Sequence, residues 1–483
     1  MNTWTRKSLY AALAGVGALG VTGAAQAVNV SIEGTGEVLI YPYYTTRADA
    51  TGNAYNSLLS VVNTTSTAKA VKVRFIEGRN SREVLDFNLF LSTRDVWTAA
   101  VVPSASGAAK VVTADKSCTL PGIPAGGQDF TNIKYSGAND DKGGLTLDRT
   151  KEGYVEIIEM ATYSPLSATA VNITHVNSVP PGCAKVTDAQ AGADALPPTG
   201  GLIGGLTLVN VNAGTDFTTE PTALAHFDDF ANLYTPSGAT TPDLGFSFPK
   251  VSVVFAGLTA DGGSTTYRSN WTVGATSPAD PVSAVLMQAQ VLNEFVLDTV
   301  TKSGTDWVVT FPTKRFYVAA GSGAAQRPFQ NNFGASGACD DVGANLFDRE
   351  ENQQSISGFS PQGTTQLCWE ANILTFNNSN VLASLNSQNL TTTFQNGWLE
   401  LDLSTTANPV HILTNANTEI VTVPGIFGGP PTFVPAATVS YIGMPVIGFQ
   451  VQTFLNGSLV VGGVNTLSNY GGNFVHKYRR QIQ

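Results

Sequence analysis

Val71-Lys72-Val73-Arg74-Phe75 alternates apolar and positively charged residues, with the two-residue period of a β-strand. Successive side chains of a strand point to opposite faces of its sheet. The pattern therefore predicts that Val71, Val73 and Phe75 face a core, while Lys72 and Arg74 face water.

The surrounding sequence continues with short strand-like runs separated by turns. The apolar run 58–62 is joined to the Val71 strand by the polar segment 63–67, which predicts a β-hairpin. Two more runs, 83–91 and 95–102, follow without a helical pattern between them. This spacing predicts an antiparallel β-sandwich of immunoglobulin-like kind over residues 28–113.

The rest of the chain divides into a loop-rich β region, 114–300, and a C-terminal β domain, 301–483. Clusters of Pro, Gly and Ala indicate loops in the first of these regions. One helix is expected from Asp280, a possible cap, through Pro281 to Phe295, although its β-branched valines also suit a strand. The predicted class is mainly β with at most one or two short helices; the expected strands are 153–159, 168–176, 206–211, 251–255, 307–311, 398–403 and 446–452.

Residues 1–27 have the features of a secretory signal peptide. Arg6 and Lys7 precede an apolar run at 9–21, and Ala25-Gln26-Ala27 has the small-x-small pattern of a cleavage site. No later run reaches the roughly 18 apolar residues of a membrane-spanning helix. We expect a mature chain of residues 28–483 in the periplasm, on the outer surface or outside the cell.

Four cysteines remain after the signal, and an even number in an oxidising compartment predicts two disulfides. Three pairings are possible. We favour Cys118–Cys183 and Cys339–Cys368, because cysteines that are neighbours in sequence usually share a domain. A zinc site is disfavoured, since there is no Cys-x-x-Cys and no nearby His at ligand spacing.

The charge composition limits the partners of the protein. Loss of Arg6 and Lys7 changes the net charge from −10 to −12, which argues against binding nucleic acid or an anionic membrane. Charged residues are only 13 % of the chain. Thr, Asn, Ser and Gly replace them, which suits either an ordinary extracellular β-protein or one that packs against copies of itself.

No catalytic motif is present. The chain lacks Gly-x-Ser-x-Gly and the metal-binding histidine motifs, and its aromatic residues are expected mainly in cores. One local cluster, His226 followed by Asp228 and Asp229, could bind a metal, but its aromatic flanks also suit a packed turn.

Calcium is the expected ligand, because acidic loops of exported proteins often supply its oxygen ligands. The candidates are Asp140 and Asp141 in one loop, and Asp340 and Asp341 in another. Neither stretch has EF-hand spacing, so solvated acidic loops are the alternative. No other cofactor is expected.

Four segments together resemble a group of uncharacterised secreted or cell-surface proteins of Gram-negative bacteria: 34–45, 60–64, 304–314 and 443–449. The resemblance covers nearly the whole mature chain. It implies a location outside the cytoplasm and carries over no reaction and no site residues.

Composition and motifs together favour a non-enzymatic, exported structural protein that self-associates into a layer or filament. Strand edges that pair with a neighbour would provide the contact. Two alternatives stay open: an adhesin that binds glycan or polymer through loops and aromatic residues, and a secreted hydrolase whose site assembles only in the fold.

Overall fold

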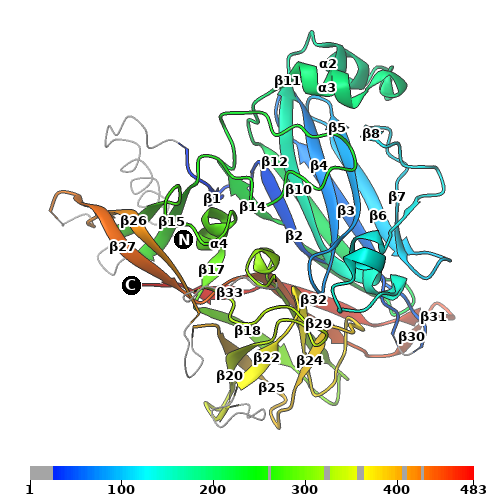
Figure 1. The fold of residues 1–483 in the computed structure, drawn as a ribbon. Helices are drawn as coiled ribbons and strands as arrows, with labels where there is room; N and C mark the ends of the chain where they lie inside the picture. Colours follow the sequence, from blue (N-terminus) through cyan, green and yellow to red (C-terminus); the bar gives the residue numbers. More distant parts are fainter. Residues whose placement is uncertain are drawn as a thin grey trace.

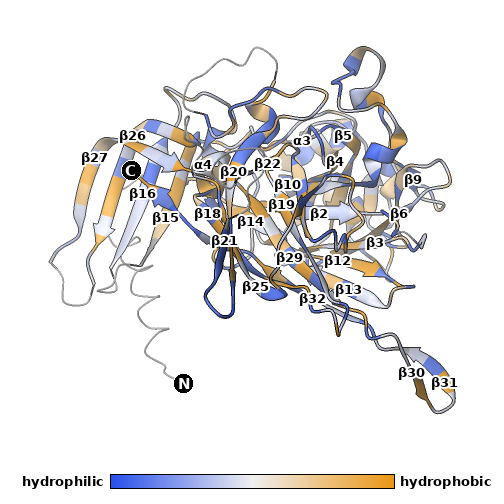
Figure 2. Cartoon of the chain, turned by 90° about the horizontal axis from the view of Figure 1, so that it is seen from below, coloured by the Kyte–Doolittle hydropathy of each residue, from blue (hydrophilic) through white to orange (hydrophobic). Residues whose placement is uncertain are grey.

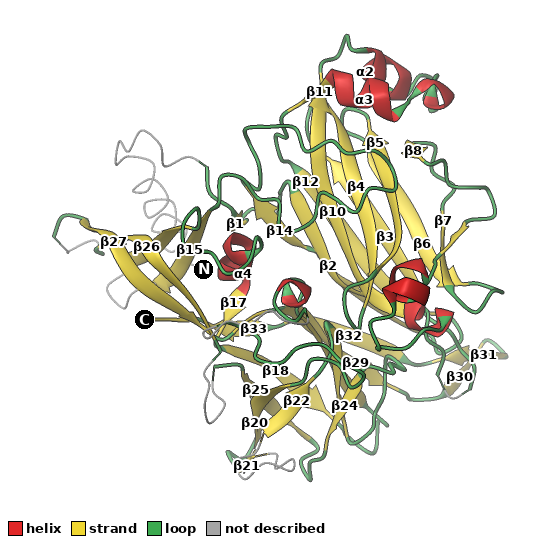
Figure 3. Cartoon of the chain, viewed as in Figure 1, coloured by secondary structure: helices red, strands yellow, loops and turns green. Residues whose placement is uncertain are grey.

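The computed structural model describes residues 26–49, 51–258, 263–319, 327–355, 364–404, 411–425 and 429–483. Antiparallel strands dominate this part of the chain, and helices are few and short (Figures 1 and 3). The predicted mainly-β class is confirmed. The predicted signal peptide lies outside the described residues except for Gln26 and Ala27.

The N-terminal sandwich consists of two sheets that enclose one apolar core. The first has the order β1-β14-β2-β10-β4-β5-β8, with β11 paired to β10; the bounds are β1 Asn29–Val30, β14 Thr222–Ala225, β2 Val38–Thr45, β10 Glu152–Tyr163, β4 Ala68–Glu77, β5 Glu83–Leu91, β8 Cys118–Leu120 and β11 Ala195–Leu196. The second has the order β13-β12-β3-β6-β7-β9; the bounds are β13 Thr215–Thr219, β12 Leu202–Asn210, β3 Asn56–Asn63, β6 Val96–Pro103, β7 Ala109–Val112 and β9 Gln128–Asp129.

The predicted hairpin between the 58–62 run and the Val71 strand is wrong. The two runs lie in β3 and β4, which belong to different sheets of the sandwich. Leu59 pairs with Ala99 and Leu206, whereas β4 pairs with β5 and β10. The polar connector crosses from one sheet to the other, and polarity alone does not distinguish that path from a hairpin turn.

The predicted exposure of Lys72 and Arg74 is also wrong, because both side chains are buried. Val71, Val73 and Phe75 face the core as expected. The opposite face of the sheet is covered by the segment around residues 227–250, whose Pro236 carbonyl accepts a hydrogen bond from Lys72. The two cations are compensated by acidic side chains: Asp86 for Lys72, and Glu83 and Glu156 for Arg74.

A second sandwich fills the C-terminal half. One sheet has the order β21-β20-β25-β18-β33, with β22 paired to β20; the bounds are β21 Gln353–Ser355, β20 Asp340–Asp348, β25 Asn396–Asp402, β18 Gln290–Val296, β33 Lys477–Arg479 and β22 Thr364–Leu367. The other has the order β24-β23-β19-β29-β32; the bounds are β24 Ser387–Leu390, β23 Ala371–Phe376, β19 Gly304–Thr310, β29 Ile447–Phe454 and β32 Tyr470–Val475. β23 and β24 run parallel.

The two sandwiches share β19, all of whose residues are buried. Trp307 and Val309 pack in the C-terminal core. Val308, on the other face of the strand, packs in the N-terminal core. The chain therefore forms stacked layers in which one sheet is covered on both sides.

A fifth sheet extends to one side of the molecule (Figure 1). Its order is β15-β16-β26-β27-β34, with bounds β15 Val251–Leu258, β16 Ser264–Asn270, β26 Ile412–Val423, β27 Thr432–Ile442 and β34 Gln481–Ile482. Two pairs of strands stand apart from the larger sheets: β17 Met287–Gln288 with β28 Met444–Pro445, and β30 Ser458–Val461 with β31 Val464–Leu467.

The described part of the chain contains three α-helices, one more than the expected maximum. α4 (Asp280–Leu286) begins where the sequence predicts but ends early, because residues from Met287 onward form β17 and β18. α2 (Ala168–Ile173) replaces the strand expected at 168–176, and α3 spans Asp188–Asp194. The side chains of Ser167 and Thr187 cap the N-termini of α2 and α3.

Short 3-10 helices span Ile133–Tyr135, Gly137–Asn139, Leu147–Lys151, Cys183–Lys185 and Lys314–Phe316.

Both predicted disulfides are confirmed. Cys118–Cys183 joins β8 to the segment between α2 and α3, and Cys339–Cys368 joins the chain beside β20 to the chain beside β22. Within the described residues, no helix has the length and apolar character needed to cross a bilayer.

The division at residues 113 and 300 stays a prediction, but strand pairing crosses both limits. β10, β12 and β14 complete the N-terminal sheets, and β18 pairs with β25 of the C-terminal half.

Candidate functional site

Glu37 and His226 are brought together by the pairing of two strands. Glu37 directly precedes β2, and His226 directly follows β14. These strands are antiparallel neighbours, with Leu224 opposite Val38, so the start of one lies beside the end of the other. The Glu37 amide donates a hydrogen bond of 2.9 Å to the Leu224 carbonyl.

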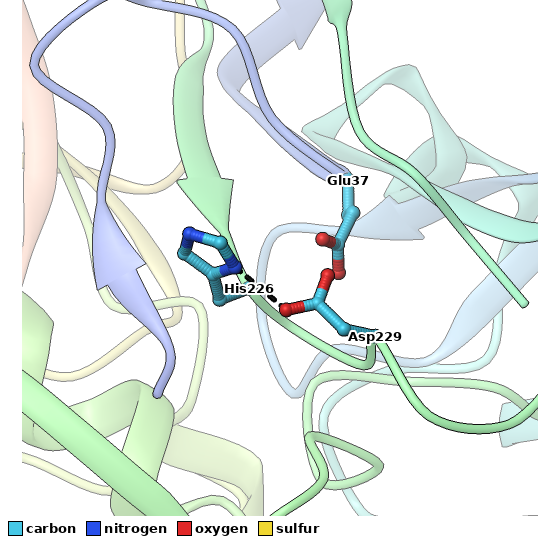
Figure 4. Close-up of side chains that lie close together, drawn as sticks. All are labelled: Glu37, His226 and Asp229. Carbon is cyan, nitrogen blue, oxygen red and sulfur yellow. Dashed lines mark hydrogen bonds and ion pairs between the residues drawn. The ribbon is translucent and has the colours of Figure 1, made fainter. Parts of the chain in front are cut away.

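Asp229 completes a cluster of three possible metal ligands (Figure 4). His226 Nδ1 lies 2.6 Å from Asp229 Oδ2. One ligand atom from each of Glu37, His226 and Asp229 lies within 4.8 Å of the other two. The Glu37 side chain is buried, whereas 47 % of the His226 side chain is exposed, so the cluster opens to solvent on the histidine side.

The 226–231 turn holds these side chains in place. His226 has a φ of +54°, which reverses the chain immediately after β14. Asp228 then donates its backbone N–H to Glu37 Oε2 at 2.7 Å. The Asp228 carboxylate accepts hydrogen bonds from the amides of Phe230 and Ala231 at 3.0 and 3.2 Å. Asp228 therefore fixes the turn, and Asp229 faces Glu37.

The electrostatics of the cluster are unfavourable for two free carboxylates. Burial, followed by the hydrogen bond with Asp229, raises the pKa of Glu37 to about 9. The negative charges of Asp229 and Glu159 act in the same direction, while the Asp228 amide acts against them. The Glu37 carboxyl group therefore favours its protonated form beside Asp229.

Sequence reasoning identified part of this cluster. It grouped His226 with Asp228 and Asp229, but the Asp228 carboxylate is used within the turn. Glu37 was missed, because its place beside His226 depends on the pairing of β2 with β14, for which the sequence has no local signal.

The first pair of calcium candidates is already engaged in ion pairs. Asp140 pairs with Lys142 at 2.7 Å. Asp141 pairs with Arg149 at 2.7 Å and with Arg82 at 3.2 Å. Calcium would have to displace these cations.

The second pair lies at the start of β20. The Gln330 amide donates to Asp340, and the Gln366 side chain donates to Asp341. Among the described residues, neither pair of candidates belongs to a group of three convergent metal ligands. The calcium role of Asp140, Asp141, Asp340 and Asp341 stays a prediction.

Ser92, His175 and Asp95 lie together near the end of β5, but not as a catalytic triad. Ser92 Oγ lies 3.1 Å from His175 Nδ1, and Asp95 Oδ2 lies 3.6 Å from the same nitrogen. In a triad the nucleophile and the acid contact different ring nitrogens. This arrangement therefore lacks the geometry of a proton relay.

The tryptophans that a glycan-binding protein would use to stack on sugars are mostly internal here. Trp97, Trp271 and Trp307 are buried in three different cores. Trp398 is half-buried and stacks on Phe347 with ring centroids 4.4 Å apart. Arg79 lies 5.2 Å from the ring of Trp369.

Two β-ribbons project at opposite ends of the molecule (Figures 1 and 2): the isolated β30–β31 pair, and the β26–β27 pair, which is part of the five-stranded sheet. The β30–β31 ribbon exposes Val460, Val461 and Val464 by 71, 62 and 66 %. Phe433 and Val434 are exposed on β27. No Asp, Glu, Lys or Arg occurs from Ile420 to Val475, a stretch that includes both exposed clusters. This uncharged stretch is visible in the sequence, but a low overall charge does not by itself locate it.

Comparison of the chain with protein-family models, with curated proteins and with solved structures found no match.

Proposed function

We propose that the protein is an exported structural protein that self-associates through the β30–β31 ribbon and the uncharged part of the β26–β27 ribbon, from Ile420 onward. The observation that carries the proposal is the β30–β31 ribbon. In the part of the chain that the structure describes, neither strand of this ribbon pairs with a third strand. Two disulfides are consistent with an oxidising location outside the cytoplasm.

An isolated two-stranded ribbon is marginally stable in water, because it buries little apolar surface. Exposed strand edges are usually protected by charged residues that prevent pairing with other chains. This ribbon has no charge and carries three exposed valines. These properties favour a ribbon that is covered when the protein assembles.

The second ribbon provides the surface to which the first would bind. Phe433 and Val434 form an uncharged apolar area there, on the same uncharged stretch of chain. Pro435 and Ala436, with a φ of +53°, interrupt the strand ladder of β27. We therefore infer that contact is made through side chains at this end rather than by addition of a strand.

Because the ribbons lie at opposite ends, the contact is head-to-tail (Figure 2). A head-to-tail contact uses different surfaces on the two copies and extends into an open chain unless the rotation closes a ring. The partner that binds to each ribbon is thus a second copy of this chain.

Sedimentation velocity over a hundredfold range of protein concentration tests the proposal. Wild type should form species larger than the monomer as concentration rises. Val460→Lys together with Val464→Lys should remain monomeric, because it places charge on the ribbon. Leu166→Lys is the matched control, since Leu166 is 90 % exposed but lies in the loop before α2. A wild type that stays monomeric, or equal loss of assembly in the control, would refute the proposal.

A further inference from the structure

The buried glutamates of the N-terminal sheet show what is unusual about Glu37. Glu77, Glu152, Glu156 and Glu159 each form an ion pair with a lysine or arginine, at 2.6 to 3.0 Å. Among the described residues, Glu37 has no such partner, and Asp229 has only His226. The four other glutamates are thus each compensated by a lysine or arginine, whereas Glu37 and Asp229 are not.

The geometry around the pair is that of a ligand set. The Glu37 and Asp229 carboxyl groups point toward one another, and His226 Nδ1 points toward Asp229 (Figure 4). Among the described residues, the hydrogen-bond partners of these two carboxyl groups, apart from each other, are the Asp228 amide for Glu37 and His226 for Asp229. We propose that Glu37, His226 and Asp229 bind one divalent transition-metal ion of the zinc class.

The donor set favours zinc over calcium. Zinc accepts imidazole nitrogen and carboxylate oxygen in four-coordinate sites, whereas calcium takes six to eight oxygen ligands. Ligand atoms bound tetrahedrally to zinc lie about 3.3 Å apart, from bond lengths of about 2.0–2.1 Å. The observed spread of up to 4.8 Å therefore requires small rotations, and the half-exposed His226 is free to make one.

The surrounding bonds limit which ligands move. Glu37 is held through Oε2 by the Asp228 amide, and the Asp228 carboxylate holds the turn. Phe227 is buried, and its carbonyl accepts a hydrogen bond of 2.7 Å from the Phe248 amide. A bound ion would therefore join the 226–231 turn to the start of β2. Three protein ligands leave one position of a tetrahedral ion for water.

Isothermal titration of Zn²⁺ into untagged, chelator-treated protein is the primary test. All four cysteines form disulfides, so free thiols contribute no competing site. We expect one ion per chain. His226→Gln and Asp229→Asn should each weaken binding more than tenfold, because each removes a direct ligand. The same titration with Ca²⁺ should give binding at least a hundredfold weaker.

His175→Gln is the matched control. His175 also lies beside a carboxylate, that of Asp95, but within the described part of the chain it belongs to no group of three convergent ligands. Its zinc affinity should equal that of wild type. Equal weakening in this control, or unchanged affinity in His226→Gln, would overturn the proposal.

Glu37→Gln distinguishes loss of metal binding from loss of folding, because the two change its melting temperature differently. Its amide can donate to Asp229 in place of the proton or metal, so without metal this variant should melt at or above the temperature of wild type. Zn²⁺ should raise the melting temperature of wild type and leave that of Glu37→Gln unchanged. Cobalt(II) should give visible d–d absorption with wild type and not with Glu37→Gln. Absence of heat, of stabilisation and of the cobalt bands in wild type would overturn the proposal without affecting the proposed assembly.

Discussion

Replacing Arg74 by methionine should be among the most destabilising single substitutions on β4. The Arg74 side chain is 1 % exposed and pairs with Glu156 at 2.6 Å and with Glu83 at 2.9 Å. Methionine fills much of the same volume but leaves both carboxylates uncompensated. Breaking a buried ion pair in this way costs about 3–5 kcal/mol.

The assay is urea unfolding at pH 8, followed by intrinsic fluorescence; urea is uncharged and does not screen the ion pairs. Arg479→Met is the matched control, because Arg479 is 62 % exposed in its 3.4 Å pair with Glu400. The cost for such a surface pair is about 0–1 kcal/mol. Adding Glu156→Gln to Arg74→Met should recover more than half of the lost stability, since the fully buried carboxylate is then removed.

The pH dependence adds a second check. Burial raises the pKa of Glu156 even with Arg74 beside it, and removal of the arginine raises it further. A raised pKa in the folded state means that stability is lost as pH increases. The deficit of Arg74→Met should therefore be smaller at pH 5 than at pH 8. A deficit below about 1 kcal/mol at pH 8, or one that does not change with pH, would refute the view that this face is sealed from water.

Three further predictions concern single buried groups and the disulfides. Glu370 is fully buried, and burial raises its pKa from 4.5 to about 8. The free energy of unfolding should therefore fall by about 1.4 kcal/mol per pH unit as pH rises between these values, and urea unfolding at pH 5 and 8 should show a flatter pH dependence for Glu370→Gln. Burial lowers the pKa of His476 from 6.5 to about 4, so wild type should lose stability as pH falls through this window, and thermal melting of His476→Gln should depend less on pH there. Replacing both cysteines of Cys118–Cys183, which are separated by 65 residues, should lower the free energy of unfolding by about 4 kcal/mol. The loss should be slightly smaller for Cys339–Cys368, whose cysteines are separated by 29 residues. Urea midpoints in the reverse order would contradict the chain-entropy argument.

Local patterns predicted where the strands lie better than they predicted which strands and segments pack beside them. The run at 83–91 coincides with β5, because its alternation and flanking turns lie within a few residues. The alternation around Val71 also assigned the core face correctly. It could not indicate what covers the opposite face, which depends on Glu156 and on Pro236, both distant in sequence.

The candidate site shows the same limit. His226 and Asp229 are three residues apart and were recognisable as a pair. Glu37 joins them only because β14 lies beside β2, an arrangement set by the whole sheet rather than by a local pattern. The helix predicted through Phe295 failed for a related reason: from Gln290 onward the chain pairs along its length with β25, and this tertiary pairing outweighs a helical spacing of apolar residues.

The double burial of β19 has a consequence for how the chain can come apart. Trp307 faces one core and Val308 the other, so withdrawing either sandwich would expose buried apolar side chains of the strand that stays behind. This strand is therefore not a domain boundary at which proteolysis or truncation would give two independently folding fragments. The two halves should melt as one cooperative unit, and a fragment ending before Gly304 should be recovered only as aggregate.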